Sequence, residues 1–222
     1  MVQIRLLDET SYSILLQPDK ASTVIPIEPS RWEVFKLYTE LGVEHILIGI
    51  DHLLFILGLL LLITGFWNLI KTATAFTVAH SITLGLSALG LVSVPQAPVE
   101  AVIALSIVFL ANEYLKTLEG KRSVTAQYPW LVAFIFGLLH GFGFAGVLQE
   151  IGFPQKDIPL ALFSFNVGVE IGQIIFILAA IGFMWMFRKF SIAYPKWTTK
   201  ILPYAMGIVA MFWVFERVSG FF

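Results

Sequence analysis

Long apolar stretches, separated by short polar segments, make up most of the chain after residue 42. A transmembrane helix needs about 20 predominantly apolar residues in succession to cross the hydrocarbon layer of a bilayer. We predict one such helix in each of six stretches: 42–66, 70–92, 97–115, 129–149, 158–187 and 200–218. The pattern therefore predicts an all-α, polytopic membrane protein of about six transmembrane helices.

The first 30 residues follow a different pattern. Apolar and polar residues alternate on both sides of Asp8-Glu9-Thr10, with the period of two that is typical of β-strands. We predict an extramembrane β-hairpin-like segment over 1–30, an interfacial helix over 31–41 and a transmembrane helical bundle over 42–222. The first segment has no basic stretch followed by an apolar core, so we expect no signal peptide in it. The chain is compatible with a mature form or with a fragment of a longer precursor.

The composition agrees with lipid as the main solvent. Hydrophobic residues make up 58% of the chain and charged residues 13%, and the mean hydropathy is +0.84, which is more apolar than soluble domains are. The net charge of -1 gives no reason to expect a nucleic acid partner, and we expect no nucleotide cofactor. The absence of cysteine excludes disulfides and thiolate metal sites.

The basic residues predict an orientation in the membrane. Eight of them fall on the side that the chain reaches after an odd number of predicted crossings: Lys71, Lys116, Lys121, Arg122, Arg188, Lys189, Lys196 and Lys200. Because lysine and arginine concentrate in cytoplasmic loops, this side is predicted to be the cytoplasmic one. We therefore expect an integral protein of a bacterial inner (plasma) membrane, with both termini outside.

All four histidines of the chain lie within predicted spans. In the first span, GVEHILIGIDHLLF, His45 and His52 are seven residues apart, so they lie within about 20° of the same helix face. Glu44 and Asp51 form a second pair with the same spacing. An aspartate at the centre of a span costs roughly 2.5–3.5 kcal/mol on insertion scales, so these groups need polar partners.

Three further spans carry polar groups at similar positions. His80 lies near the middle of the second span, in FTVAHSITL, and His140 near the middle of the fourth, in FGLLHGFGFAG. The fifth span contains FNVGVEIGQ, which includes Glu170. Counted from the starts of their spans at about 1.5 Å per residue, these three residues share the depth of His52, while His45 lies nearer the outside. Four helices are therefore expected to present ligands to one central site.

We interpret these groups as one metal site of mixed imidazole and carboxylate ligands. The predicted ligands are His45, Asp51, His52, His80, His140 and Glu170, and the predicted supporting residues are Glu44, Ser81, Asn166 and Gln173. Each histidine alone is equally compatible with a hydrogen bond to a neighbouring helix. Without thiolates, the set suits nickel, cobalt, zinc or iron(II) and disfavours calcium and magnesium. Asp51 is either a ligand or the acceptor that orients a ligating histidine.

The motifs HILIGIDH, FTVAHSITL, LHGFGFAG and FNVGVEIGQ, over about residues 42–180, resemble those of the HupE/UreJ family of hydrogenase and urease accessory membrane proteins. The resemblance implies a nickel or cobalt permease, with His45, Asp51 and His52 at the matching positions of the first metal motif. The second motif of such permeases has two His-Gly pairs and a glutamate on one helix, and here only His140-Gly141 is present. His80 and Glu170 are candidates to replace the missing ligands.

Together these observations favour a divalent transition-metal permease with a site at the bilayer midplane. The alternative is a metal-dependent intramembrane hydrolase, in which three histidines hold zinc and Asp51 or Glu170 acts as the general base. A haem held by two histidines is a further alternative, and so is a scaffold in which the polar groups only join helices. The expected partners are the metal ion, as substrate or cofactor, and membrane lipid. The sequence leaves the oligomeric state open.

Overall fold

The computed structural model describes residues 2–5, 11–14, 30–151, 157–189 and 196–220, and the chain divides into two units, Met1–Ser30 and Arg31–Phe222. In the first unit, β1 (Val2–Arg5) and β2 (Ser11–Ile14) pair in an antiparallel way, with Val2 opposite Ile14 and Arg5 opposite Ser11. The predicted turn at residues 8–10 lies outside the described residues, so the β-hairpin-like segment stays a prediction there.

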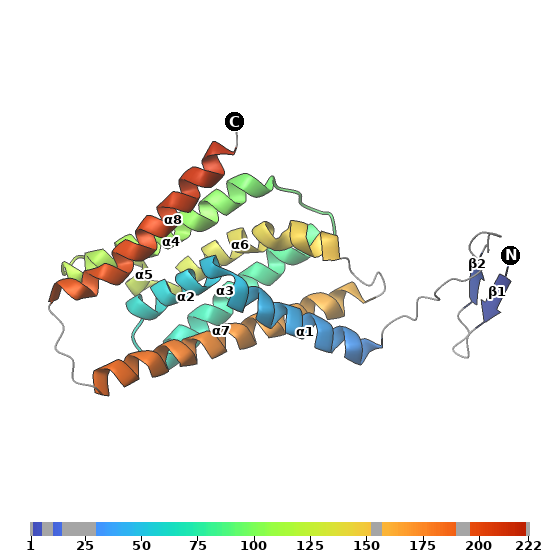
Figure 1. Ribbon diagram of the computed structural model, residues 1–222, viewed down its shortest axis with the longest axis horizontal. Coiled ribbons are helices and arrows are strands. Elements are labelled where there is room, and N and C mark those ends of the chain that lie inside the picture. The colour runs from blue at the N-terminus through green and yellow to red at the C-terminus, as the bar shows by residue number, and fades with distance from the viewer. Residues whose placement is uncertain (1, 6–10, 15–29, 152–156, 190–195, 221–222) are drawn as a thin grey trace. The chain divides into compact units, whose positions relative to one another are not determined.

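The second unit is helical throughout its described part (Figure 1). Its elements are α1 (Arg31–Ile48), α2 (Ile50–Leu62), α3 (Phe66–Ala88), α4 (Gln96–Leu118), α5 (Val124–Gln127), α6 (Pro129–Ile151), α7 (Ile158–Lys189), the 3-10 helix η1 (Lys196–Lys200) and α8 (Ile201–Ser219). The prediction of a helical bundle is confirmed. Consecutive long helices are joined by short connections, as the proline-containing breaks in the sequence indicate.

The number of membrane spans is smaller than predicted. Four described stretches are long and apolar enough to cross a membrane: Phe66–Ala88, Gln96–Leu118, Ile158–Met186 and Thr198–Ser219. The bent pair α1 and α2 makes a fifth if it is counted as one span, and in α6 the apolar part described with its side chains, Pro129–Gly143, is shorter. Among the described residues, the prediction of six spans is therefore corrected to four or five. Counting apolar residues measured the length of each run but could not detect a break inside one.

That break lies at Gly49, within the stretch predicted as the first span. Helix α1 continues from Arg31 through the expected boundary at residue 41 and ends at Ile48, and α2 leaves it at an angle of 71°. A Cβ atom at Gly49 would lie 2.6 Å from Nδ1 of His52 and 2.8 Å from the carbonyl oxygen of His45. Glycine is therefore required where the chain bends, because any side chain would collide with the two histidines.

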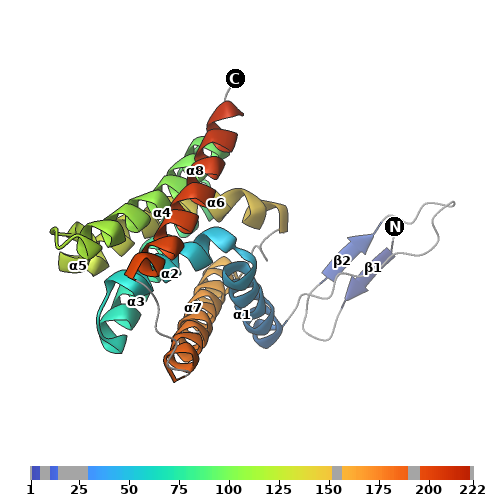
Figure 2. The ribbon, with the colours of Figure 1, turned by 60° about the vertical axis from the view of Figure 1, so that its left-hand side comes forward.

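Small residues bring the remaining helices close together. Helix α3 packs along α6, α1 along α7, and α4 along α8 (Figures 1 and 2). A Cβ atom at Gly137 or Gly141 of α6 would overlap the carbonyl oxygens of Phe76 and His80 on α3, and Gly42 makes the same kind of approach to α7. Glycines that admit a neighbouring backbone are typical of helix contacts in membranes. They hold the histidine-bearing segments within reach of one another.

The outward faces of α7 and α8 are strongly apolar. Large side chains with exposed fractions of 60% or more lie on these two helices: Phe163, Phe183, Trp185, Ile208, Phe212 and Phe215. A water-soluble protein rarely leaves so much contiguous apolar surface uncovered. Contact with lipid chains accounts for this surface.

Candidate metal centre

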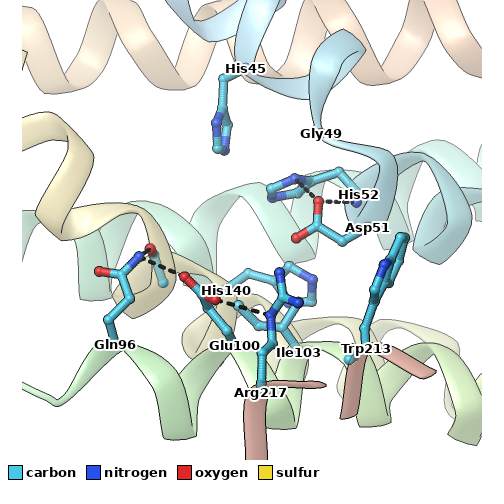
Figure 3. Close-up of a pocket in the computed structure, with 12 residues that line it drawn as sticks. His45, Gly49, Asp51, His52, Gln96, Glu100, Ile103, His140, Trp213 and Arg217 are labelled. Atoms are coloured by element: carbon cyan, nitrogen blue, oxygen red, sulfur yellow. Dashed lines mark hydrogen bonds and ion pairs between the residues drawn. The ribbon is translucent and has the colours of Figure 1, made fainter. Parts of the chain in front are cut away.

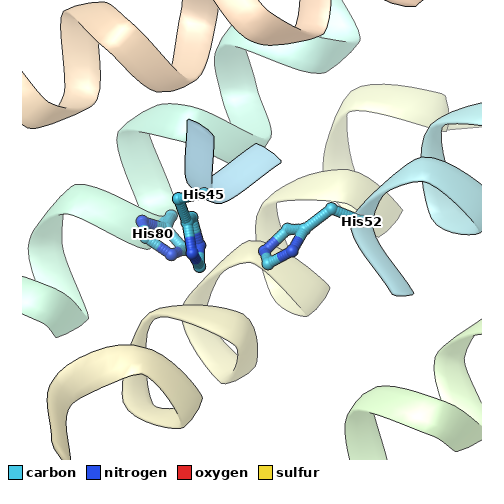
Figure 4. Close-up of side chains that lie close together, drawn as sticks. All are labelled: His45, His52 and His80. Carbon is cyan, nitrogen blue, oxygen red and sulfur yellow. The ribbon is translucent and has the colours of Figure 1, made fainter. Parts of the chain in front are cut away.

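Three histidines from three helices lie together in the helical unit (Figure 4). His45 is in the last turn of α1, His52 in the first turn of α2, and His80 in the middle of α3. One ring nitrogen of each lies within 4.8 Å of the others. Because nitrogen ligands bind zinc-like ions at about 2.0–2.1 Å, modest side-chain adjustments would bring all three onto one ion. We call His45, His52 and His80 the histidine cluster.

The bend at Gly49 explains why His45 belongs to this cluster. The apolar pattern predicts one straight helix over 42–66, in which His45 would lie nearer the outside than His52. In the structure the 71° bend folds the end of α1 back over the start of α2, and the two ring centroids are 4.6 Å apart. The predicted difference in depth is therefore wrong, since it depended on an unbroken helix.

The cluster is poor in hydrogen bonds for its degree of burial. His52 is 5% exposed and His80 is 1% exposed. Nε2 of His52 has no hydrogen-bond partner among the described residues, and the ring of His80 has none beyond a weak interaction with the side chain of Asn166. A buried polar group without a partner costs about 1–3 kcal/mol. Neutral imidazole is a common transition-metal ligand, so these residues fit a metal ion.

Asp51 lies against His52 (Figure 3). Its Oδ1 accepts a hydrogen bond from the backbone N–H of His52 at 2.8 Å and lies 3.1 Å from Nδ1 of the His52 ring. A carboxylate in this position fixes the orientation of the ring and leaves Nε2 for a ligand. Of the two roles considered for Asp51, this geometry corresponds to the acceptor.

His140, on α6, lies beside the cluster and is not one of its grouped residues. Its ring centroid is 5.2 Å from that of His52, and its Nδ1 lies 2.9 Å from the carbonyl oxygen of Phe136. If Nδ1 donates to that carbonyl, Nε2 carries the lone pair, and Nε2 is buried with no hydrogen-bond partner in the described part of the chain. His140 is thus a fourth imidazole adjacent to the cluster.

Glu170, by contrast, is separate from the histidine cluster. Its Oε1 accepts a hydrogen bond from the Thr74 hydroxyl of α3 at 2.5 Å, and one turn along, Thr77 donates to Gln173 at 3.1 Å. Asn166 donates to a carbonyl of its own helix. Residue counting predicts only a depth for Glu170, and depth does not determine which neighbour a side chain faces. The structure does not bring Glu170 to the three histidines.

The two other predicted supporting residues do not contact the grouped nitrogens through any described hydrogen bond. Glu44 is exposed on α1. The hydroxyl of Ser81 donates to the carbonyl oxygen of Thr77, one turn earlier in the same helix, at 2.7 Å. The Ser81 hydroxyl therefore makes its hydrogen bond within α3, as serine hydroxyls in helices often do.

A cavity of about 200 Å³ leads to the histidine cluster (Figure 3). Its lining includes two of the clustered histidines together with Asp51 and His140, and also four residues that the sequence analysis missed: Gln96, Glu100, Trp213 and Arg217. The signal that could have found two of them is charge inside an apolar stretch, because Glu100 and Arg217 lie within predicted spans.

Comparison with known proteins gives one match. A family model described as "HupE / UreJ protein" matches residues 21–217, which is most of the chain. No curated protein and no solved structure matches the chain.

Proposed function

The chain belongs to the HupE/UreJ family, and on that premise we propose that it is a divalent transition-metal permease of the nickel or cobalt type. Its four or five apolar helices agree with an integral membrane protein. The observation that carries the proposal is the grouping of three imidazoles from three helices within 4.8 Å, beside a cavity. The imported ion is the substrate, and the histidine cluster is its binding site in transit.

The ligand set suits an ion that must be released again. Three imidazoles without a thiolate select borderline metals such as nickel, cobalt and zinc over calcium and magnesium. Neutral imidazoles add no negative charge. The nearby carboxylate of Asp51 therefore neutralises only part of the positive charge of the ion. A transport site has to bind strongly enough to take up the ion and weakly enough to let it go. A three-nitrogen site with one outlying carboxylate meets that requirement better than a closed four-thiolate site.

The predicted orientation in the membrane gives the proposed path a direction. The cavity lies at the start of α4 and near the end of α8, which the positive-inside rule assigns to the outside. Glu170 bonds to Thr74, which is closer than His80 to the start of α3 and hence to the predicted cytoplasmic side. In the proposed path the ion enters from the cavity, binds the histidine cluster, and passes Glu170 on its way inward.

Metal accumulation in cells that express the protein tests the permease. We expect nickel or cobalt uptake above background, and its loss in the variants His52→Ala and His80→Phe at equal protein levels. The matched control is Ser81→Ala, because Ser81 neighbours His80 but bonds only to its own helix among the described contacts. Unchanged accumulation of nickel, cobalt, zinc and iron in the wild type would contradict the proposal.

A second function is favoured by one specific observation. Three imidazoles, a carboxylate and a cavity are also the parts of a catalytic zinc site, in which water occupies the fourth position. A metal-dependent intramembrane hydrolase would retain zinc at one ion per chain through purification and would cleave a lipid or amide substrate. A permease would lose its metal to a mild chelator and show no such cleavage.

A further inference from the structure

Three polar residues that line the cavity form a hydrogen-bonded group that the metal cluster does not explain. Nε of Arg217 lies 3.0 Å from Oε2 of Glu100. Nε2 of Gln96 donates to Oε1 of Glu100 at 3.0 Å and to the carbonyl oxygen of Gly143 at 2.7 Å. This group joins α4, α6 and α8 across the cavity (Figure 3). We call Gln96, Glu100 and Arg217 the mouth group.

The mouth group lies between the outside of the protein and the histidine cluster. The side chains of Glu100 and Arg217 are each 33% exposed, whereas the side chain of His52 is 6% exposed. All three residues line the same cavity. An ion that reaches the cluster through this cavity therefore meets Glu100 and Arg217 first.

We infer that Glu100 is an outer recognition site for the divalent cation, and that Arg217 occupies this site as a tethered cation until the ion displaces it. The identity of the ion rests on the proposed function. The site itself rests on the geometry of the mouth group. Its oxygen donors are the Glu100 carboxylate and the side-chain oxygen of Gln96, which suit a hydrated ion better than imidazoles do. The ion then moves inward to the stronger nitrogen ligands.

Arg217 has a second anionic partner, which remains available when a cation displaces the guanidinium from Glu100. Its Nη1 lies 3.3 Å from Oε2 of Glu216, whose side chain is 56% exposed. When a cation takes Glu100, the guanidinium keeps an anionic partner at the surface. Without that partner the exchange would leave an unpaired positive charge beside the incoming ion, which like-charge repulsion opposes.

Charge counting distinguishes this role from a simple tie between helices. The charged side chains that line the cavity are Asp51, Glu100 and Arg217. Removing the charge of Arg217 makes the cavity more negative, and removing that of Glu100 makes it positive at the mouth. A mere tie between helices predicts that either loss loosens the same contact and shifts the half-saturating ion concentration for uptake in the same direction. The proposed site predicts changes of opposite sign.

The absence of native cysteine allows a direct measurement of the potential in the cavity. In an Ile103→Cys background, which places one thiol in the cavity lining, we would measure the labelling rates with a cationic and an anionic methanethiosulfonate reagent. Their ratio reports the local potential without any metal. We expect Arg217→Gln to raise the cation-to-anion ratio roughly tenfold and Glu100→Gln to lower it by a similar factor. The double variant should return close to the starting ratio.

Two controls make the result decisive. Lys121→Gln removes a cation that pairs with Glu119 at 2.7 Å beyond the opposite end of α4, and it should leave the ratio unchanged. A double variant that labels like the starting protein shows that the bundle still folds. Ratios that shift in the same direction in both single variants would overturn the recognition site.

Uptake measurements then connect the site to the ion. Glu100→Gln should raise the half-saturating nickel concentration several-fold with little change in maximal uptake, and Arg217→Gln should lower it. If the wild type transports no metal, the permease proposal fails, while the labelling experiment still decides whether the mouth group sets the potential of the cavity. Equal half-saturating concentrations in a transporting wild type and both variants would overturn the role of Glu100.

Discussion

Two polar clusters lie in the helical unit, and they differ in how far their buried atoms are hydrogen-bonded. Near the end of α4, Glu113 is fully buried, and its carboxylate accepts from Nζ of Lys116 at 2.8 Å, from the Ser123 hydroxyl at 2.8 Å and from the backbone N–H of Thr125 at 3.0 Å. In the histidine cluster, Nε2 of His52 is buried and has no such partner among the described residues.

This difference distinguishes a structural cluster from the proposed binding site. Native proteins rarely leave buried polar atoms without partners, and each exception calls for an explanation such as an ion. The Glu113 cluster uses both of its carboxylate oxygens to fasten α5 and the preceding loop to α4, so it has little capacity left for a ligand. The histidine cluster retains unused ring nitrogens next to a cavity. A single unsatisfied atom, such as the buried Oγ1 of Thr125 in the Glu113 cluster, does not make a site, whereas the histidine cluster brings several imidazole nitrogens close together beside a cavity.

The largest effect expected from this comparison is loss of metal binding in His80→Phe. The ring of His80 is nearly parallel to those of Phe76 and Phe165, with interplanar angles of 22° and 20°, so phenylalanine keeps these ring contacts and removes only the nitrogens. We expect nickel affinity of the purified protein to fall roughly 100- to 1,000-fold, measured by equilibrium dialysis. The melting temperature should change little. If the nickel affinity of His80→Phe equals that of the wild type, the histidine cluster does not differ from the Glu113 cluster as a metal site.

The next largest effect is on stability at the other cluster. In Glu113→Ala, the Ser123 hydroxyl and the Thr125 N–H lose their acceptor and Lys116 loses its counter-ion. We expect a loss of about 3 kcal/mol in the free energy of unfolding, measured by denaturant titration in detergent. Nickel affinity of the folded fraction should remain that of the wild type. A large loss of metal affinity at full stability would show that Glu113 takes part in binding.

A smaller effect on metal affinity is expected for Asp51→Asn. The amide keeps the shape of the side chain but loses the charge that orients the His52 ring. Groups in this position typically contribute 10- to 100-fold to metal affinity, and we expect a decrease in roughly that range in the same dialysis measurement. A loss as large as that in His80→Phe would instead make Asp51 a ligand.

The smallest effect is expected for Thr77→Val, which removes the hydrogen bond from α3 to Gln173 of α7. Hydrogen bonds between membrane helices contribute about 0.6 kcal/mol on average, so unfolding should shift by about that amount. Metal affinity should not change, because the Thr77 hydroxyl and the Gln173 side-chain oxygen are hydrogen-bonded to each other. A clear fall in affinity would extend the binding site from the histidine cluster toward α7.

Much of the helical architecture could be predicted from the sequence, because long apolar runs require internally hydrogen-bonded segments in lipid. The histidines were also identified as a candidate site. An ionisable group inside an apolar span is energetically costly, so it usually has a functional role. The bend at Gly49 could not be predicted, because a glycine inside an apolar run is compatible with a continuous helix. The bend explains why the first predicted span is not one straight helix and why His45 lies beside His52. The span count is also lower because the apolar part of α6 described with its side chains, Pro129–Gly143, is short.

Side-chain direction limited the prediction of the site. Glu170 was assigned to the site by its predicted depth, but its contact with Thr74 depends on how α7 is rotated against α3, which no single-chain pattern specifies. The mouth group was missed because Glu100 and Arg217 lie near the ends of their helices, where charges are common. Only their 3.0 Å contact across two helices sets them apart.

Nickel binding to the detergent-purified protein, compared between the wild type, His80→Phe and Glu170→Gln, tests the central claim most directly. If His45, His52 and His80 form the metal site, the wild type and Glu170→Gln bind one ion per chain with similar affinity, and His80→Phe does not bind at the same concentrations. Wild-type binding by His80→Phe, or its loss in Glu170→Gln, would contradict the assignment of the site to the histidine cluster.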